Sequence, residues 1–114
     1  MRTSKFVTYE VALEVVEVLA SGPLAQILRK DPKLADQLDR ASTSTVLNLA
    51  EGSRRRGRDR WKHYMIADAE AEEARGALRV SVAKRLLDSE AAERVDEVMD
   101  RLARLRWGLM HPKA

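Results

Sequence analysis

Apolar residues recur every three or four positions along almost the whole chain, which is the spacing expected of amphipathic helices. The stretch 32–51 shows the pattern clearly, with one stripe formed by Leu34, Leu38, Ala41, Thr45 and Leu49. β-branched residues do not gather into the alternating runs that predict strands. Ala, Leu, Glu and Arg, which are good helix formers, dominate the composition. The sequence therefore predicts an all-α fold.

Four helices are predicted, over residues 4–20, 32–51, 58–87 and 89–109. Residues 21–23, which read Ser-Gly-Pro, end the first helix, and the short run 24–30 is expected to add a turn or two. Because the connections are mostly short, neighbouring helices are expected to run antiparallel and form an up-down four-helix bundle. We expect this bundle to be a single domain over residues 1–114, since the chain has the usual length of one domain.

Particular residues are expected to mark the helix ends. Asp31 can cap free backbone N–H groups at the start of the second helix, with Pro32 at the first helical position. Asp88 or Ser89 is expected to do the same for the fourth helix. Gly52 is expected to end the second helix in the left-handed conformation, which glycine adopts at little cost.

The composition excludes several classes of site. Cysteine is absent, which excludes disulfides, thiolate nucleophiles and cysteine metal sites and agrees with a reducing cytoplasm. Charged residues make up 34% of the chain, and no apolar run reaches the ~20 residues that a membrane span needs. Glu10, Glu14 and Glu17 interrupt the apolar N-terminal run, so we do not expect a signal peptide. We therefore expect a cytoplasmic protein with no membrane partner.

Several large apolar residues fall outside the predicted core stripes and indicate self-association. The first helix is expected to bury Phe6, Tyr9, Leu13, Val16 and Ala20. The third helix is expected to bury Trp61 and Tyr64. The residues outside the stripes are Val15, Val18, Val46, Leu47, Val80 and Trp107. Spare apolar surface often marks an oligomer interface, and Trp107 is the best single candidate for a subunit contact. The alternative is that these residues only broaden the core.

A basic segment connects the second and third helices. Its cations are Arg54, Arg55, Arg56, Arg58, Arg60 and Lys62, and with Asp59 among them the local charge is +5. Such a segment can contact several phosphates of RNA or DNA and release their counterions. The net charge of +3 is compatible with that role without establishing it. Base stacking by Trp61 and Tyr64 is the weaker hypothesis, because both fall on the predicted core stripe. The alternative is a solvated turn.

Five polar residues lie near the predicted helix contacts, namely Gln37, Arg40, Asn48, Glu51 and Glu73. The structural interpretation is a polar network that ties the helices together and fixes their register, with Arg40 paired to a glutamate. The alternative is a catalytic carboxylate pair formed by Glu51 and Glu73. We favour the network.

The sequence lacks the other components of an active site. The hydroxyl run at residues 42–45 has no nearby histidine or lysine base to activate a nucleophile. His63 and His111 have no visible partner, and neither follows a glutamate by three residues, as a di-metal bundle site needs. No glycine loop has the spacing of a phosphate-binding fingerprint. We therefore expect no catalysis, metal, cofactor or small-molecule substrate.

Residues 37–52 and 61–78 carry a motif that resembles the four-helix bundle proteins of the 23S rRNA intervening-sequence family. That family includes the accessory variability determinant of diversity-generating retroelements. Its pattern begins Gln-Leu-x-Arg-Ala, continues with Ser and Asn-(Ile/Leu)-Ala-Glu-Gly, and after a basic loop reads Ile-Ala-x-Gly-Ser-x-x-Glu. The matching positions are Gln37, Leu38, Arg40, Ala41, Ser44, Asn48, Leu49, Ala50, Glu51, Gly52, Ile66, Ala67 and Glu73. Ala69 and Glu70 stand where the family has Gly-Ser.

The resemblance implies a left-handed up-down bundle that assembles into a ring, typically a homopentamer. Known members of the retroelement branch are basic, bind nucleic acid and associate with a reverse transcriptase, whereas most of the family has no established biochemical function. Two functions therefore remain open. The first is a ring-forming protein that binds RNA or DNA through the basic segment, as an accessory to a reverse transcriptase. The second is a protein-interaction scaffold with no nucleic-acid role.

Overall fold

The computed structural model describes residues 4–112, and every regular element in this range is an α-helix. The helices are α1 (Lys5–Ala20), α2 (Pro23–Lys30), α3 (Pro32–Arg54), α4 (Gly57–Ala83) and α5 (Ser89–Met110). The all-α prediction is confirmed. The run after the first helix forms a complete short helix, α2, so the described chain has five helices rather than four.

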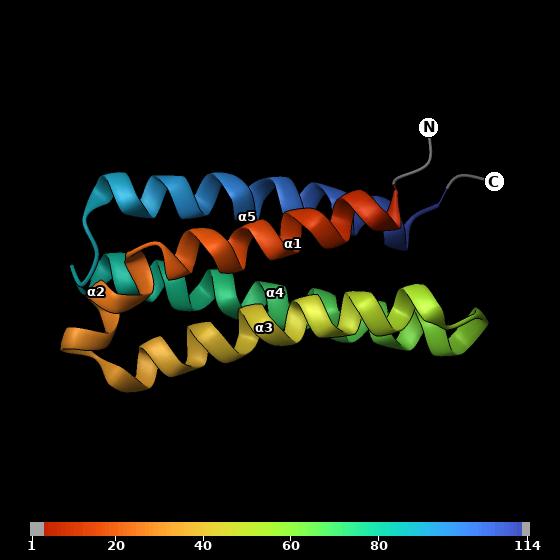
Figure 1. Ribbon diagram of the computed structural model, residues 1–114, viewed down its shortest axis with the longest axis horizontal. Helices are drawn as coiled ribbons and strands as arrows, with labels where there is room; N and C mark the ends of the chain where they lie inside the picture. Colours follow the sequence, from red (N-terminus) through yellow and green to blue (C-terminus); the bar gives the residue numbers. More distant parts are fainter. Residues whose placement is uncertain (1–3, 113–114) are drawn as a thin grey trace.

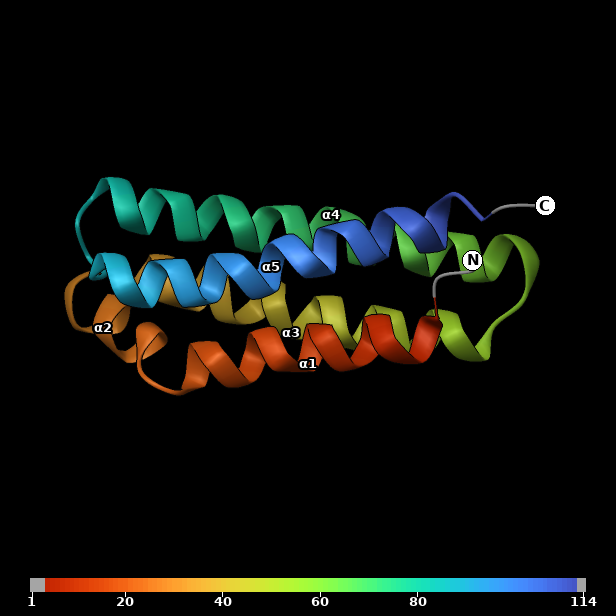
Figure 2. The same cartoon turned by 90° about the horizontal axis from the view of Figure 1, so that it is seen from above.

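The four long helices lie side by side, and α2 lies at one end of the molecule (Figures 1 and 2). Successive long helices run in opposite directions, and the molecule is elongated, with extents of 45 × 24 × 20 Å. The turn between α3 and α4 lies at the end opposite α2, together with the first turn of α1 and the last turn of α5 (Figure 1). This topology gathers three separate parts of the sequence at one end.

Aspartate side chains cap the starts of α3 and α5. Asp31 accepts a hydrogen bond from the Leu34 N–H at 3.1 Å, and Pro32 occupies the first turn of α3. Asp88 accepts in the same way from the Ala91 N–H at 2.8 Å. These hydrogen bonds lower the pKa of both carboxyl groups, because they favour the charged form. Both helices therefore begin at the residues that their capping chemistry favours.

Gly52 does not end its helix, because α3 continues through it to Arg54. Gly52 is buried, and a Cβ atom built on it would lie 2.6 Å from Cε1 of Tyr64 on α4. Carbon atoms do not approach so closely, so a glycine is needed where the two helices meet. The expected left-handed cap was wrong, because the missing side chain of glycine, and not its backbone freedom, decides this position.

The end of α4 also differs from the prediction, since the helix stops at Ala83 and not at residue 87. Arg85 has a left-handed φ of 58°. Its N–H donates to the Val82 carbonyl at 3.0 Å, and the Leu86 N–H donates to the Ser81 carbonyl at 2.9 Å. This pair of bonds is the Schellman arrangement, which usually has glycine at the left-handed position. An arginine there carried no signal of a helix end.

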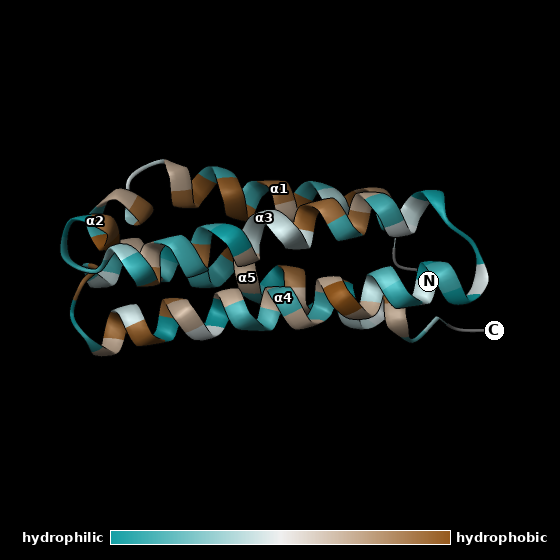
Figure 3. Cartoon of the chain, turned by 90° about the horizontal axis from the view of Figure 1, so that it is seen from below, coloured by the Kyte–Doolittle hydropathy of each residue, from teal (hydrophilic) through white to brown (hydrophobic). Residues whose placement is uncertain are grey.

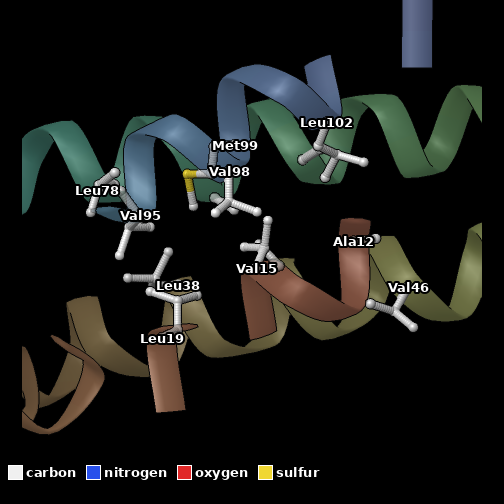
Figure 4. Packing of buried hydrophobic residues seen from close by; sticks show 14 of the residues in the cluster. Ala12, Val15, Leu19, Leu38, Val46, Leu78, Val95, Val98, Met99 and Leu102 are labelled. Atoms are coloured by element: carbon white, nitrogen blue, oxygen red, sulfur yellow. The ribbon is translucent and has the colours of Figure 1, made fainter. Parts of the chain in front are cut away.

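The core lies between the long helices (Figure 4) and follows the predicted stripe on α3, but it includes the predicted stripe on α1 only at its edge. On α1 the buried residues are Thr8, Val11, Ala12, Val15 and Leu19. Of the predicted stripe, Tyr9, Leu13 and Val16 are partly buried against this core, whereas Phe6 is 71% exposed and Ala20 is exposed as well. Val15 and Val46, which were expected outside the stripes, are buried. Because α1 is apolar on two sides, residue spacing alone did not identify the side that faces inward.

No helix in residues 4–112 is by itself long and apolar enough to cross a membrane. Only α1 and α2 taken together reach that length and apolarity, and a bend of 53° separates them.

Candidate nucleic-acid interface

The basic segment forms the last turn of α3, the connection that follows and the first turns of α4. We call its six cations the basic turn: Arg54, Arg55, Arg56, Arg58, Arg60 and Lys62. Figure 3 shows hydrophilic residues around this connection, at the end of the molecule opposite α2. Lys5, at the start of α1, reaches the same place and donates to the Ser53 carbonyl at 3.2 Å. The fold thus adds a cation from a distant part of the sequence.

Arg60 donates hydrogen bonds to backbone carbonyls at the end of α3. Its Nε donates to the Gly52 carbonyl at 3.1 Å, and its Nη2 donates to the Ser53 carbonyl at 3.3 Å. Carbonyls in the last turn of a helix lack their usual helical donors, and cationic side chains commonly bond them. The negative end of the helix dipole also favours a cation here. Arg60 therefore has a structural role that competes with phosphate binding.

Carboxylates partly neutralise Arg54 and Arg55. Arg55 Nη1 lies 2.8 Å from Asp59 Oδ2, and its Nη2 lies 3.5 Å from Glu51 Oε2. The hydrogen bond to Asp59, together with the charge of that group, raises the pKa of Arg55. Arg54 lies 3.9 Å from the other oxygen of Glu51. Exposed pairs contribute little to stability, but these pairs lower the positive charge that the basic turn presents.

Arg56, Arg58 and Lys62 are exposed and have no carboxylate partner among residues 4–112. Arg56 directly precedes α4, whereas Arg58 and Lys62 lie four residues apart in its first turns and share a face of the helix. Gly57 has a left-handed φ of 56°, which glycine adopts at little cost, and it turns the chain into α4. These three side chains are the cations best placed to contact phosphates.

Trp61 and Tyr64 lie in different environments, although both were expected on the core stripe. Tyr64 is buried against Gly52, and burial raises the pKa of its hydroxyl. Trp61 is 44% exposed. The prediction was correct for Tyr64 and wrong for Trp61, because α4 buries a narrow face that includes Ala67 and Ala71. Only Trp61 is therefore open to base stacking.

The five polar residues of the predicted network, all in the described part of the chain, do not bond one another. Arg40 pairs with Asp36 on its own helix at 3.5 Å, and Glu51 pairs with two arginines of the basic turn. Gln37, Arg40 and Glu73 line a groove between α3 and α4. Within the described residues no hydrogen bond joins any two of the five. The same part of the chain contains no group of His, Asp and Glu suited to a metal ion.

Asn48 connects two helices through a partner that the sequence reasoning missed. Its Oδ1 lies 3.1 Å from Nδ1 of His63 on α4, and its amide donates to the Ser44 carbonyl at 3.0 Å. Because an amide oxygen only accepts, His63 Nδ1 carries the hydrogen and donates it. The two residues lie 15 positions apart, and the antiparallel packing of α3 against α4 brings them together.

A second missed group surrounds Arg106 on α5. Arg106 is only 3% exposed, and its Nη1 donates to the carbonyl of Asp68 at 3.1 Å and to the carboxylate of the same residue. Its Nη2 lies 2.8 Å from Glu72 Oε2. A further ion pair has its arginine on α4 and its carboxylate on α5, since Arg75 lies 3.1 Å from Asp96. These ion pairs hold α4 and α5 together along their length.

Large apolar side chains are exposed on α4 and α5 near the same end of the molecule. Trp107 is 63% exposed and Met65 is 49% exposed. Trp61, Met65 and Asp68 share a face of α4, because residues three and four positions apart are neighbours on a helix. Because Asp68 bonds Arg106, this stretch of α4 lies beside the C-terminal part of α5, which carries Trp107. We call Trp61, Met65 and Trp107 the apolar patch.

Comparisons with known proteins identify the family. The family model for the 23S rRNA-intervening sequence protein matches residues 7–108. The crystal structure of a protein with unknown function from the S23 ribosomal protein family of Bacteroides thetaiotaomicron VPI-5482 has a similar fold, with a TM-score of 0.79. It is 21% identical in sequence, and the alignment covers 94% of this chain and 97% of that one. No curated protein matches the chain. The chain therefore belongs to the 23S rRNA-intervening sequence protein family.

Proposed function

We propose that the protein is a non-enzymatic, ring-forming up-down four-helix bundle that binds RNA or DNA through the basic turn. The ring we propose is a homopentamer, because the sequence motif resembles proteins that form rings of five. A role as an accessory to a reverse transcriptase, in the cytoplasm, rests on the same resemblance. We propose binding and not catalysis, because Glu51 and Glu73 have separate surroundings.

The observation that supports nucleic-acid binding is the set of exposed cations at the basic turn that have no carboxylate partner among residues 4–112. Over the whole chain 21 basic residues face 18 acidic ones, so binding needs a place where positive charge is concentrated. Arg56, Arg58 and Lys62 provide such a place at one end of the molecule. Each phosphate contact releases counterions, and a ring would repeat the contacts in every subunit and multiply weak binding by avidity.

The apolar patch supports self-association. Large exposed apolar residues, and tryptophan above all, are enriched in protein interfaces. Trp61 and Trp107 are both in the patch, and Trp107 is the more exposed of the two. We propose that the patch packs against a neighbouring subunit, with Trp107 as its main contact.

A protein-interaction scaffold is the second candidate. Its supporting observation is that half of the basic turn is already occupied within the chain. Arg54 and Arg55 pair with carboxylates, and Arg60 bonds the end of α3. Under this alternative the remaining cations only keep the turn solvated.

Fluorescence anisotropy with labelled duplex DNA and hairpin RNA, across a salt series, tests the proposal. The informative variant combines Arg56→Ala, Arg58→Ala and Lys62→Ala. For the unmodified protein we expect log K to fall with log salt, with a slope of about −0.9 for each duplex phosphate contacted. The triple variant is expected to lose most of the affinity and most of this slope.

The matched control combines Lys30→Ala, Arg79→Ala and Arg94→Ala, which removes the same charge from exposed positions outside the basic turn. We expect the control to bind like the unmodified protein. An equal loss in both variants would mean that net charge alone drives binding. No binding at low salt would reject nucleic-acid binding and leave the scaffold as the better account.

A further inference from the structure

A small cavity lies at the centre of the molecule, between all four long helices. Its lining residues are Ala12, Val15, Ser42, Thr45, Ala71, Ala74, Met99, Leu102 and Arg106. Every one of them is buried, and Figure 4 shows Ala12, Val15, Met99 and Leu102 on facing helices. The volume within which the centre of a water molecule could move is ≈ 10 Å³. That space is close to the smallest that holds one water molecule.

Arg106, which lines the cavity, has one buried nitrogen with no partner in the described protein. The terminal nitrogens of Arg106 bond Asp68 and Glu72, but its buried Nε has no hydrogen-bond acceptor among residues 4–112. Folded proteins rarely leave a buried N–H unbonded, because the group has lost its water without replacement. When no protein oxygen is in reach, the usual acceptor is an ordered water.

Two hydroxyl groups complete the polar part of the wall. Ser42 Oγ donates to the Asp39 carbonyl at 3.1 Å, and Thr45 Oγ1 donates to the Ala41 carbonyl at 2.8 Å. Each hydroxyl has used its hydrogen but keeps lone pairs that accept. A water between them and Arg106 would accept from Nε and donate to the two hydroxyl oxygens. Three partners is the number that buried waters typically have.

We propose that this cavity binds one ordered water molecule, which bridges Arg106 on α5 to Ser42 and Thr45 on α3. The chemistry of the wall favours water over other small ligands. Asp68 and Glu72 already balance the charge of Arg106, so an anion such as chloride gains little attraction there. An apolar ligand would leave Nε unbonded. The water thereby extends the polar contacts between α4 and α5 to a third helix, through the centre of the core.

A high-resolution crystal structure of the unmodified protein tests the site directly. We expect electron density for a water within about 3.2 Å of Arg106 Nε, the usual limit of an N–H···O hydrogen bond. Water ¹⁷O relaxation dispersion tests the same site in solution, where one long-lived water per chain is expected from this cavity. Density that lacks a water there would overturn the proposal, whether Nε is bonded to a protein oxygen or left unbonded.

The double variant Ser42→Ala and Thr45→Val removes both hydroxyls while leaving the wall nearly unchanged in shape. We expect it to lose the long-lived water. A water that persists in this variant would overturn the proposed bridge. If the double variant fails to fold, the crystal structure of the unmodified protein still decides the question.

The control is the double variant Thr8→Val and Ser81→Ala. Both residues are fully buried, and their hydroxyls donate to the carbonyls four positions earlier in the chain at 2.8 and 2.9 Å, much as the hydroxyls of the cavity do. Neither residue lines the cavity. We therefore expect this variant to keep the long-lived water, and an equal loss in both variants would also overturn the proposal. Nucleic-acid binding is independent of this result, because the cavity and the basic turn share no residue.

Discussion

At Gly52 the absence of one methyl group determines how closely α3 and α4 approach each other. A Cβ there would lie 2.6 and 2.7 Å from two ring carbons of Tyr64. The same glycine accepts a hydrogen bond from Arg60 through its carbonyl, at 3.1 Å. The Asn48–His63 hydrogen bond lies one turn away along α3. A shift at this residue would therefore also move the start of α4 and its cations.

Substitution of Gly52 by alanine is expected to destabilise the protein. The methyl group would force the Tyr64 ring or the helices apart. The overpacking outweighs the gain in helix propensity, so we expect a net loss of about 1 to 2 kcal/mol in the free energy of unfolding. Chemical denaturation followed by circular dichroism measures this loss.

Gly76→Ala is the matched control for that substitution. Gly76 also lies inside a helix, but nothing comes within 4 Å of a Cβ built on it. Alanine there is expected to add up to about 1 kcal/mol of stability through its higher helix propensity. If the two substitutions had the same effect, the close contact with Tyr64 would not be what selects glycine at position 52.

Among the helices, α4 is ended by backbone hydrogen bonds, although the residue at the left-handed position is an arginine and not a glycine. The bonds from the Arg85 and Leu86 N–H groups reach back to Val82 and Ser81 and close the helix. They require a left-handed residue at Arg85, whose φ is 58°. The early end of α4 lets the chain reach Asp88, which caps α5.

Arg85→Gly is expected to stabilise the protein. An L-residue with a side chain pays about 1–2 kcal/mol for the left-handed conformation, and glycine avoids most of this cost. Part of the gain is lost because glycine has more freedom in the unfolded chain, which leaves about 0.5 to 1 kcal/mol. Thermal and chemical unfolding of the two proteins would measure it.

Lys84→Gly is the control one position earlier. Lys84 has a right-handed conformation, with φ −81° and ψ −2°, so glycine relieves no strain there. The substitution also removes the ion pair between Lys84 and Asp31, at 3.1 Å, and both effects are expected to destabilise the protein. Loss of stability in both variants would show that the left-handed residue is not a source of strain in this connection.

For the whole molecule, the topology places the basic turn and the apolar patch at the same end. The basic turn comes from the connection between α3 and α4, whereas Trp107 comes from the far end of the sequence. A ring built through the apolar patch would therefore bring the basic turns of its subunits close together. The proposed assembly and the proposed binding site are then two properties of one end of the bundle.

Trp107→Ala is expected to weaken the assembly without unfolding the subunit. Trp107 is 63% exposed, and within its own chain it stacks on His111, with ring centroids 4.1 Å apart. Its loss should lower the molar mass that light scattering reports after size-exclusion chromatography, toward that of a single chain. The circular dichroism spectrum should be unchanged.

Leu28→Ala is the control for the assembly. Leu28 is 53% exposed and lies on α2, at the opposite end of the molecule. We expect it to leave the molar mass unchanged. An unmodified protein that is already monomeric, or a Trp107 variant of unchanged mass, would count against the proposed interface.

Several features follow from short stretches of sequence because local chemistry determines them. The spacing of Leu34, Leu38 and Leu49 indicated which side of α3 is buried, and the structure buries that side. Asp31 and Asp88 act through backbone N–H groups three residues further on, so each start is a property of a few neighbouring residues. The cations of the basic turn lie within nine consecutive positions of the sequence, so they are close together whatever the tertiary structure.

Other features arise only where distant segments pack together. α1 has apolar residues on two sides, and contact with the other helices selects the side with Val15 and not the side with Phe6. The roles of Gly52 and His63 depend on a residue of the facing helix, and so does the burial of Arg106. The sequence by itself thus determined where the four long helices begin and which cations lie between α3 and α4. Tertiary structure decided which faces meet and which cations stay free, because those depend on contacts between residues far apart in the chain.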